Sequence, residues 1–205
     1  MVLRVLTYVD GFNLYHSIKD LGDDFSYLKW QNLFKLSKTF LSKNDEIISL
    51  KFFTAYPTWK PHSHKRHLAF VEILKDLGID VIEGSFKTKE VFCTHCKHTF
   101  IKHEEKQTDV NIAVHIVNDI YRNKAEIIQL ISGDTDLIPP LNVAKNNAFK
   151  IHLVVPRKRK VNGFDSIIDK KSKIKIEHLK NSFLGDFYTT KTGKIIKCPY
   201  PIPQN

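Results

Sequence analysis

The chain has 205 residues, of which 42% are hydrophobic and 26% charged, a composition typical of a globular protein and not of a disordered one. This length allows one domain with a substantial core, or one domain with an appendage. The apolar start of the chain, residues 2–9, is interrupted by Asp10 before it could form a signal-peptide core, and no segment requires a transmembrane helix. Three cysteines do not suggest a disulfide framework, so we expect a cytoplasmic protein.

The formal net charge is +10, and it is spread unevenly along the chain. Residues 1–150 carry 20 basic and 18 acidic side chains, whereas residues 151–205 carry 12 and 4. This polarity favours a polyanionic partner, with nucleic acid ahead of a membrane because no amphipathic apolar anchor accompanies the basic residues. The alternative is a lysine-rich surface that serves only solubility.

Strands and helices are predicted to alternate from the first residues onward. Residues 2–9 indicate a strand, Asp10-Gly11-Phe12-Asn13 a tight turn, and the next residues a helix. Apolar spacing predicts a helix within residues 28–41, a strand over 47–56, a helix near 67–77 and a strand over 79–84. This order predicts an α/β fold with a parallel sheet and helices on both faces.

Residues 87–103 interrupt the alternation and resemble a short β-hairpin with a Cys-x-x-Cys turn. Cys93 and Cys96 at this spacing can chelate zinc, but a closed structural site needs four ligands. His98 and His103 are the nearest candidates for the other two positions. The alternative is a hairpin with two reduced thiols.

A helix is predicted from Thr108, as its cap, to about residue 123, with Asp109 in the first turn. An apolar run then ends at Ser132-Gly133 and leads to Asp134 and Asp136, which indicates a buried strand delivering two carboxylates to its carboxyl end. A turn in which Asp136 caps the next helix explains the pair equally well. A helix to about residue 146 and a fifth strand over 150–155 follow.

These assignments place four distant aspartates, Asp10, Asp109, Asp134 and Asp136, at one edge of the sheet. Carboxylates gathered in this way repel one another unless a cation such as Mg²⁺ or Mn²⁺ is bound or some of them are protonated. An acidic site in a basic protein suits metal-assisted phosphodiester hydrolysis, with lysine and arginine holding the flanking phosphates. Neither a G-x-G-x-x-G stretch nor a P-loop is present, which disfavours dehydrogenase and kinase functions.

Three stretches of the chain, residues 8–15, 104–110 and 132–137, resemble in this order the signature segments of the NYN family, the LabA-like group of PIN-like nucleases. The resemblance implies a three-layer α/β/α sandwich with a central, mostly parallel sheet of about five strands, acting on RNA with a metal ion. It implies that the four aspartates are metal ligands, that Asn13 orients a ligand or substrate phosphate, and that Lys106 contacts phosphate. Two positions depart from the family pattern, because Lys97 and Gln107 stand where relatives frequently have glycine.

The sequence therefore predicts a nuclease domain over residues 1–156, with a hairpin insertion at 87–103, and a basic C-terminal extension over residues 157–205. We expect a metal-dependent ribonuclease, an endonuclease acting on single-stranded or looped RNA, with Mg²⁺ or Mn²⁺ and with a structural Zn²⁺ as an additional candidate. The RNA backbone is expected to contact the basic run Arg157, Lys158, Arg159 and Lys160. A non-catalytic RNA-binding module of the same fold, a DNA-directed nuclease and a homo-oligomeric state all remain open.

Overall fold

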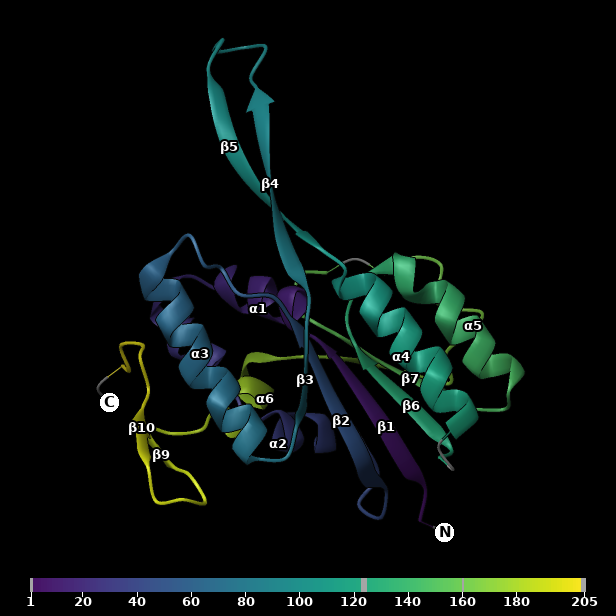
Figure 1. Cartoon of the computed structure of the whole chain (residues 1–205). Coiled ribbons are helices and arrows are strands. Elements are labelled where there is room, and N and C mark those ends of the chain that lie inside the picture. Colours follow the sequence, from purple (N-terminus) through teal and green to yellow (C-terminus); the bar gives the residue numbers. More distant parts are fainter. Residues whose placement is uncertain (1, 123–124, 160, 204–205) are drawn as a thin grey trace.

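The computed structural model describes residues 2–122, 125–159 and 161–203, and strands and helices alternate along most of it (Figure 1). In chain order the elements are β1 Arg4–Asp10, α1 Gly11–Lys19, the 3-10 helix η1 Asp23–Lys29, α2 Leu33–Lys38, β2 Glu46–Thr54, α3 Pro61–Asp76, β3 Asp80–Glu83, β4 Ser85–Phe92, β5 Thr99–Lys106, α4 Thr108–Arg122, β6 Ile127–Ile131, the 3-10 helix η2 Thr135–Leu137, α5 Ile138–Asn146, β7 Lys150–Val155, β8 Lys170–Lys173, α6 Ile176–Asn181, β9 Phe187–Thr189 and β10 Ile195–Lys197.

The central sheet has six strands in the order β3-β2-β1-β6-β7-β8, and all neighbouring pairs are parallel. The chain moves outward from β1 to β3 and then returns to the other side of β1 to form β6. Consequently β1 and β6 are neighbours whose following loops lead away in opposite directions. Such a reversal opens a crevice at the carboxyl ends of the two strands, which is where open α/β sheets bind their ligands.

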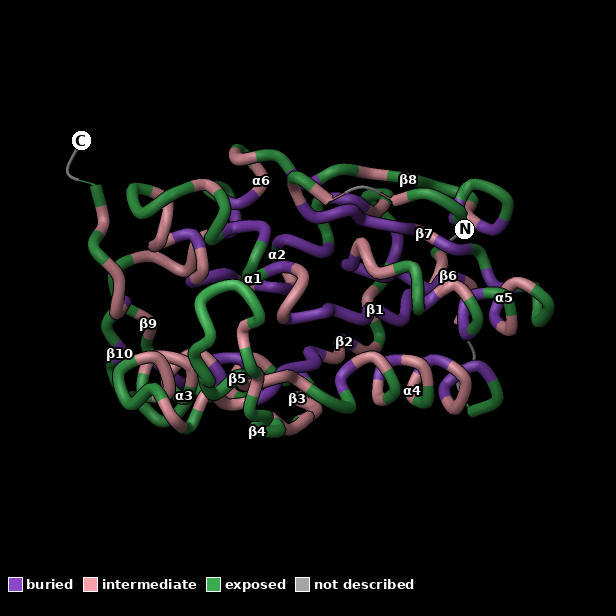
Figure 2. The backbone as a smooth tube through the Cα atoms, turned by 90° about the horizontal axis from the view of Figure 1, so that it is seen from above, coloured by how far each residue is buried: buried purple, intermediate pink, exposed green. Residues whose placement is uncertain are grey.

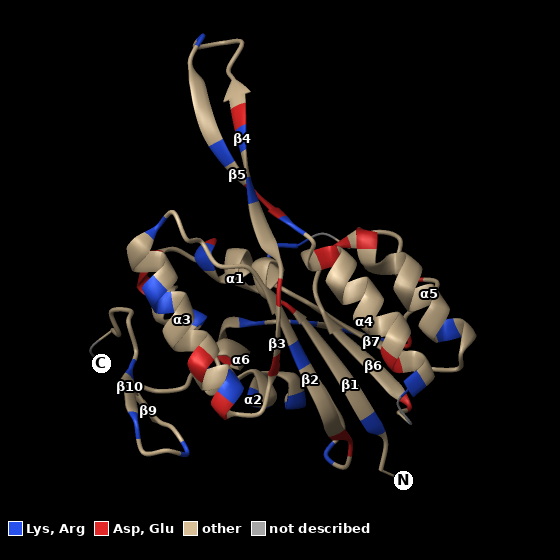
Figure 3. Ribbon diagram, viewed as in Figure 1, with Lys and Arg blue, Asp and Glu red and all other residues tan. Residues whose placement is uncertain are grey.

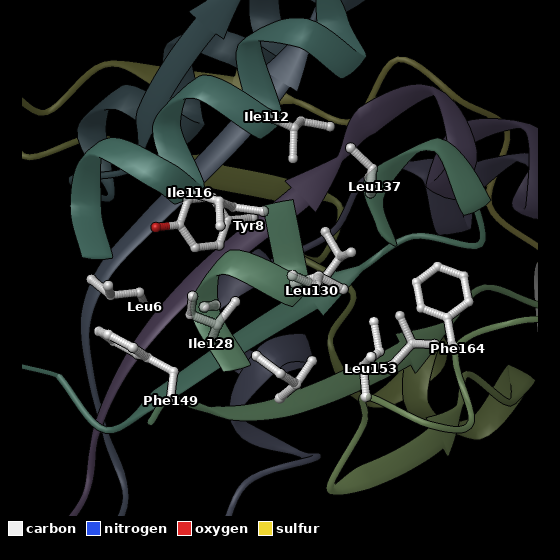
Figure 4. Packing of buried hydrophobic residues seen from close by; sticks show 14 of the residues in the cluster. Leu6, Tyr8, Ile112, Ile116, Ile128, Leu130, Leu137, Phe149, Leu153 and Phe164 are labelled. Carbon is white, nitrogen blue, oxygen red and sulfur yellow. The ribbon is translucent and has the colours of Figure 1, made fainter. Parts of the chain in front are cut away.

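Both faces of the sheet are buried, which makes three layers. Consecutive strand residues point to opposite faces, so Tyr8 and Leu130 lie in a core with α4 and α5 (Figure 4), whereas Val9 and Ile131 lie in a second core with α1, α2 and α6. The tube view shows the central strands as mostly buried and the outer elements as largely exposed (Figure 2). The predicted three-layer α/β/α fold is therefore confirmed.

The sixth strand, β8, was not predicted and comes from residues that we had assigned to the basic extension. It pairs with β7 from His152↔Lys170 to Val155↔Lys173. Its sequence, Lys-Lys-Ser-Lys, has no apolar alternation because an edge strand has few neighbours to pack against, and lysines are common on exposed sheet edges. Further on, the β9–β10 hairpin contacts α3 through Tyr188, whose hydroxyl donates to Asp76 (2.7 Å).

The helix expected within residues 28–41 is replaced by η1 and the short helix α2. The break between them follows from polar side chains. The Gln31 amide donates to the carbonyls of Leu28 (2.8 Å) and Leu179 (3.0 Å), and Asn32 accepts from the backbone N–H of Lys35 as the cap of α2. These side chains compete with a continuous helix for backbone hydrogen bonds.

None of the helices in the described parts of the chain has the length and apolar character needed to cross a bilayer.

The predicted hairpin is present and projects from the sandwich as β4 and β5 (Figure 1). Its ladder is longer than expected, running from Ser85↔Lys106 to Phe92↔Thr99. Lys97 in its turn (φ 57°) and Gln107 just after its base (φ 80°) both adopt left-handed backbone conformations. Left-handed geometry is strained for side chains with a Cβ atom, and these are the two positions at which the sequence analysis noted a departure from the family pattern.

Candidate active site

Acidic side chains gather where β1 and β6 end. Figure 3 marks the positions of acidic residues, in red, on the ribbon at the base of the hairpin and at the chain segments that begin α4 and α5. Asp10 is the last residue of β1, and Ser132, Gly133 and Asp134 follow β6 directly. The group therefore lies where the strand order reverses, the position at which open α/β sheets bind ligands, and we call this region, with Asp10, Asp109, Asp134 and Asp136, the acidic crevice.

Asp10 lies deepest in this group, with 3% of its surface exposed. Its carboxylate accepts a hydrogen bond from the backbone N–H of Asn13 (2.9 Å), so that Asp10 caps α1. The carboxylate also accepts a hydrogen bond from the hydroxyl of Ser132 (2.7 Å). Burial raises the pKa of Asp10, the two hydrogen bonds oppose that rise, and the nearby charges of Asp134 and Glu105 add to it. A cation beside Asp10 would relieve both unfavourable effects.

Ser132 and Asn13 connect the ends of the two strands. The Ser132 hydroxyl donates to Asp10 and also accepts from the backbone N–H of Asp134 (3.1 Å). The side-chain oxygen of Asn13 accepts from the backbone N–H of Gly133 (3.1 Å). In this arrangement Asn13, predicted to orient a ligand, fixes the loop that carries Asp134.

Asp109 in the first turn of α4 is sensitive to the whole group. Its pKa is raised to about 6, first by burial and then by the charges of Asp134, Asp10, Glu105 and Asp136. The charges of these carboxyl groups therefore act on Asp109, which places the four aspartates that the sequence analysis singled out in one region of the molecule.

Glu105 is a fifth acid of this group, and the sequence analysis missed it as a site residue. One of its carboxylate oxygens accepts from the backbone N–H of Thr108 (3.0 Å) and from the Thr108 hydroxyl. Its neighbour Glu104 forms ion pairs with Lys102 (3.0 Å) and Lys106 (3.2 Å) instead. The alternation of side chains along β5 could have separated the two glutamates, because only every second residue points toward α4.

Two predicted helix caps are wrong. Asp136 does not cap the helix after it, because Asp134 accepts from the Asp136 backbone N–H (3.0 Å) as the cap of η2. Thr108 is the first residue of α4 and not its cap, and Glu105 accepts from its backbone N–H. Both assignments fail for the same reason: an acid two or three residues upstream reaches the free N–H groups first.

The predicted basic residues divide between the rim of the site and its surroundings. The Arg159 side chain packs over Gly133, because a Cβ atom added to Gly133 would lie 2.8 Å from the Cβ atom of Arg159. The Arg159 guanidinium is 3.7 Å from the Asp20 carboxylate. The ammonium of Lys158 donates to the Asp20 carbonyl (2.7 Å). Arg157 is half-buried, Lys106 pairs with Glu104, and Lys160 lies outside the described residues.

The predicted zinc ligands are not assembled in one place. Cys93 and Cys96 lie together in the hairpin turn, where the Cys96 backbone N–H is 3.5 Å from the Cys93 sulfur, and hydrogen bonds lower the pKa of Cys93. His103 lies near the middle of the ladder, opposite Thr88, and stacks on Trp59 with ring centroids 3.8 Å apart. His98 is exposed beside the turn. Zinc binding by the two cysteines stays a prediction.

The donor chemistry of the acidic group fits a hard divalent cation. Its side-chain ligands are carboxylate oxygens, which suit Mg²⁺ and Mn²⁺ better than softer metals. Among the described residues, no three Asp, Glu, His or Cys side chains are placed to hold an ion by themselves. Mg²⁺ commonly takes only one or two protein carboxylates and completes its shell with water and substrate phosphate.

The parallel sheet, its flanking helices and the acidic crevice together define a protein with a PIN-like nuclease fold. The chain belongs to the NYN domain family, which it matches over residues 4–174, from β1 through β8. It is also similar to 6-hydroxy-3-succinoylpyridine 3-monooxygenase HspA of Pseudomonas putida (strain DSM 28022 / S16), with 24% identity over 89% of this chain and 69% of that protein. A solved structure described as "Structural Basis for the Mechanism and Regulation of Sir2 Enzymes" aligns over 89% of this chain and 91% of that chain at 10% identity. Its TM-score of 0.39 is too low for any conclusion about this chain.

Proposed function

We propose that this protein is a metal-dependent ribonuclease, an endonuclease that hydrolyses phosphodiester bonds in single-stranded or looped RNA. The observation that supports the proposal is that the charges of Asp10 and Asp134, which lie at the carboxyl ends of β1 and β6, act on Asp109 in the first turn of α4. Membership of the NYN family supports a nuclease-like activity and a nucleic-acid partner.

Asp10 and Asp134 are the central ligands in this proposal, and Asp109 and Asp136 complete the site directly or through water. Glu105 joins them because its charge raises the pKa of both Asp10 and Asp109. A divalent ion bound there supplies Lewis acidity at the scissile phosphate and lowers the pKa of a bound water.

The remaining side chains hold the site and the substrate. The hydroxyl of Ser132 and the side chain of Asn13 keep the loop after β6 in register with the end of β1. Arg159 lies over Gly133 at the edge of the crevice, where a guanidinium can contact a flanking phosphate. Such phosphate contacts bind RNA irrespective of its sequence.

The test is cleavage of a single-stranded RNA by the purified protein with Mg²⁺ or Mn²⁺, comparing wild type with Asp10→Asn and Asp134→Asn. We expect cleavage by the wild type that needs the metal, and near-complete loss in both variants. Equal activity in all three proteins would contradict the assignment. A DNA oligomer of the same sequence, assayed in parallel, distinguishes a ribonuclease from a DNA-directed nuclease.

A non-catalytic RNA-binding module of the same fold makes a different prediction. Its RNA binding depends on salt because it rests on phosphate contacts, but it depends neither on metal nor on Asp134. The gathering of five carboxyl groups favours the enzyme, since a module that only binds RNA gains nothing from repelling phosphate at its crevice.

A second candidate function is an activity on a small aromatic acid. The similar Pseudomonas putida protein is named for a reaction of 6-hydroxy-3-succinoylpyridine, and this chain has a cavity beside α1 lined with aromatic and basic side chains. The discriminating experiment is equilibrium binding of that compound to the purified protein. Binding without RNA cleavage would favour this second candidate.

A further inference from the structure

A cavity of about 320 Å³ lies beside α1, outside the acidic group described above. Residues from α1, from the β2–α3 connection and α3, from the base of the hairpin and from the C-terminal segment line it. Its volume is within the range of pockets that hold small ligands. We call it the aromatic cavity, defined by Phe12, Tyr15, Trp59, Phe70, Phe86 and Tyr200.

Trp59 and His103 stack face to face in this cavity. Their rings are parallel within 5° with centroids 3.8 Å apart, and Phe86 meets the Trp59 ring edge-on at 4.5 Å. Three aromatic rings held in this way from two separate parts of the chain leave the indole little freedom. Unpaired RNA bases stack on such side chains with little preference for sequence, because every base has a π face.

The other chemical character of the cavity is positive charge. Lys19, Lys29, Lys60 and Arg66 line it, and none of the described residues that line it is an acid. Lys29 and Arg66 approach the same ring, that of Tyr200, at 5.5 Å and 5.6 Å from its centroid. The pKa of Lys29 is lowered by burial and by the charge of Arg66, so an anion between the two cations would stabilise both.

The aromatic cavity adjoins the acidic crevice through the first turn of α1. Gly11 and Phe12, which line the cavity, follow Asp10 without a gap, and Phe12 contacts Phe86 with ring centroids 5.6 Å apart. Asn13, the next residue, contacts the loop that carries Asp134. A nucleotide in the cavity therefore lies next to the crevice along a strand that passes over this turn.

We propose that the aromatic cavity is a nucleotide subsite, which takes one unstacked base of single-stranded RNA against Trp59. Of the two phosphates joined to that nucleotide, Lys29 and Arg66 hold the one that lies farther from the crevice. The base fixed in the cavity selects the phosphodiester bond that reaches the acidic group. This inference rests on the proposed ribonuclease function and gives a structural reason for its preference for unpaired RNA, since a base inside a duplex cannot enter the cavity.

The test is binding of fluorescently labelled single-stranded RNA to the full chain in the Asp134→Asn background, which removes cleavage. Trp59→Ala and Arg66→Ala are each expected to weaken binding about tenfold or more, a size typical of losing one stacked base or one buried phosphate contact. Lys65→Ala, which changes the exposed neighbour of Arg66 on the same helix, is the matched control and is expected to stay within about twofold. Trp59→Phe keeps a ring for stacking and is expected to restore most of the affinity, which excludes misfolding as the cause.

A second arm uses RNA of the same length with one abasic nucleotide, moved along the strand. For the Asp134→Asn protein we expect affinity to fall at one position, and for the Asp134→Asn, Trp59→Ala protein we expect no further loss at that position. Uniform binding across all positions and variants would overturn the subsite even if the wild type cleaves RNA. Conversely, absence of metal-dependent cleavage in the wild type would contradict the ribonuclease function. The position-dependent loss of RNA binding would still decide whether the cavity takes a base.

A third arm separates RNA from a small aromatic acid. The probes are a nucleoside 5′-monophosphate and 6-hydroxy-3-succinoylpyridine, and the signal is the fluorescence of Trp59, with Trp59→Phe as the blank that retains the fully buried Trp30. A response to the nucleotide supports the subsite. A response to the pyridine compound alone, with no effect of RNA, would overturn it.

Discussion

The acidic crevice and the aromatic cavity lie on either side of the first turn of α1, and they have opposite chemistry. In the crevice, burial and then the neighbouring carboxyl groups raise the pKa of Asp109 to about 6, and in the cavity burial and then the charge of Arg66 lower the pKa of Lys29. Each region keeps like charges close together, which is unfavourable unless a ligand of the opposite charge is present. In the proposed complex one RNA strand and a cation satisfy both regions at once, with the metal in the crevice and an RNA phosphate in the cavity.

The strongest way to test the crevice is to compare two of its acids. Asp134 lies beside Ser132 and Asp10, whereas Asp136 is exposed and its charge is the weakest of those that raise the pKa of Asp109. Asp134→Asn is expected to reduce RNA cleavage by roughly 10³-fold, equivalent to losing several kcal/mol of charge stabilisation, and Asp136→Asn by about tenfold. Rates measured at saturating Mn²⁺ check this order. A larger loss for Asp136→Asn would contradict the geometry described here.

His67 lines the aromatic cavity, and its imidazole contacts the Thr54 hydroxyl (2.9 Å). Burial, together with His64, lowers the pKa of His67 from 6.5 to about 4. Below pH 6.5 the unfolded chain binds a proton that the folded chain does not, so stability falls as the pH drops to about 4, by about 3 kcal/mol in total. Urea unfolding at several pH values is expected to show this loss in the wild type and not in His67→Gln.

The control for this prediction is His62→Gln, which changes an exposed histidine of the same helix. It is expected to keep the acid sensitivity of the wild type. Parallel curves of stability against pH for the wild type and His67→Gln would show that His67 is not held neutral.

The closeness of the two regions depends on Gly11. A Cβ atom there would lie 2.5 Å from the carbonyl oxygen of Phe53 and 2.7 Å from the ring of Phe52, so α1 can approach β2 this closely only with glycine. Gly11→Ala is expected to destabilise the fold by roughly 2 kcal/mol through overpacking. Denaturant unfolding measures the change, and Lys19→Ala, at an exposed position of the same helix, serves as the control and is expected to change stability little.

The smallest expected effect concerns the junction between the hairpin and α4, which positions Glu105 and Asp109. Gln107 has a φ of 80°, so Gln107→Gly is expected to stabilise the protein by about 1 kcal/mol by removing the strain of a left-handed residue. Gln107→Ala keeps that strain and loses the 3.0 Å hydrogen bond from Ser85, so it is expected not to stabilise. Thermal unfolding of both variants checks the prediction, and equal melting temperatures would contradict it.

The sequence predicted the strands that are buried on both faces because their apolar runs are unmistakable. The run ending at Ser132 is β6, and the strand over residues 150–155 is β7 with the same bounds. Parallel strands place their carboxyl ends together, so the grouping of Asp10 with Asp134 followed from the alternation of strands and helices. The three stretches that resemble the NYN family pointed to the same residues.

What the sequence did not predict depends on contacts between distant segments. β8 has no apolar pattern because it is an edge strand, and it could be found only from its pairing with β7. The aromatic cavity needs Trp59, Phe86 and Tyr200 to meet across about 140 residues of chain, and no spacing in the sequence reveals that. His103 was assigned to zinc on the basis of its nearness in sequence to the cysteines, whereas the ladder carries it to Trp59.

Thermal unfolding in the presence of Mn²⁺ tests most directly whether the acidic crevice is a cation site. For the wild type we predict a melting temperature that rises with Mn²⁺, corresponding to about 2.7 kcal/mol at a concentration one hundred times the dissociation constant. For Asp134→Asn we predict no rise, and without metal a stability at least equal to that of the wild type because one repelling charge is gone. Both proteins should carry Cys93→Ser and Cys96→Ser so that the hairpin cannot contribute. No effect of Mn²⁺ on the wild type, or the same effect on both proteins, would contradict a cation site in the acidic crevice.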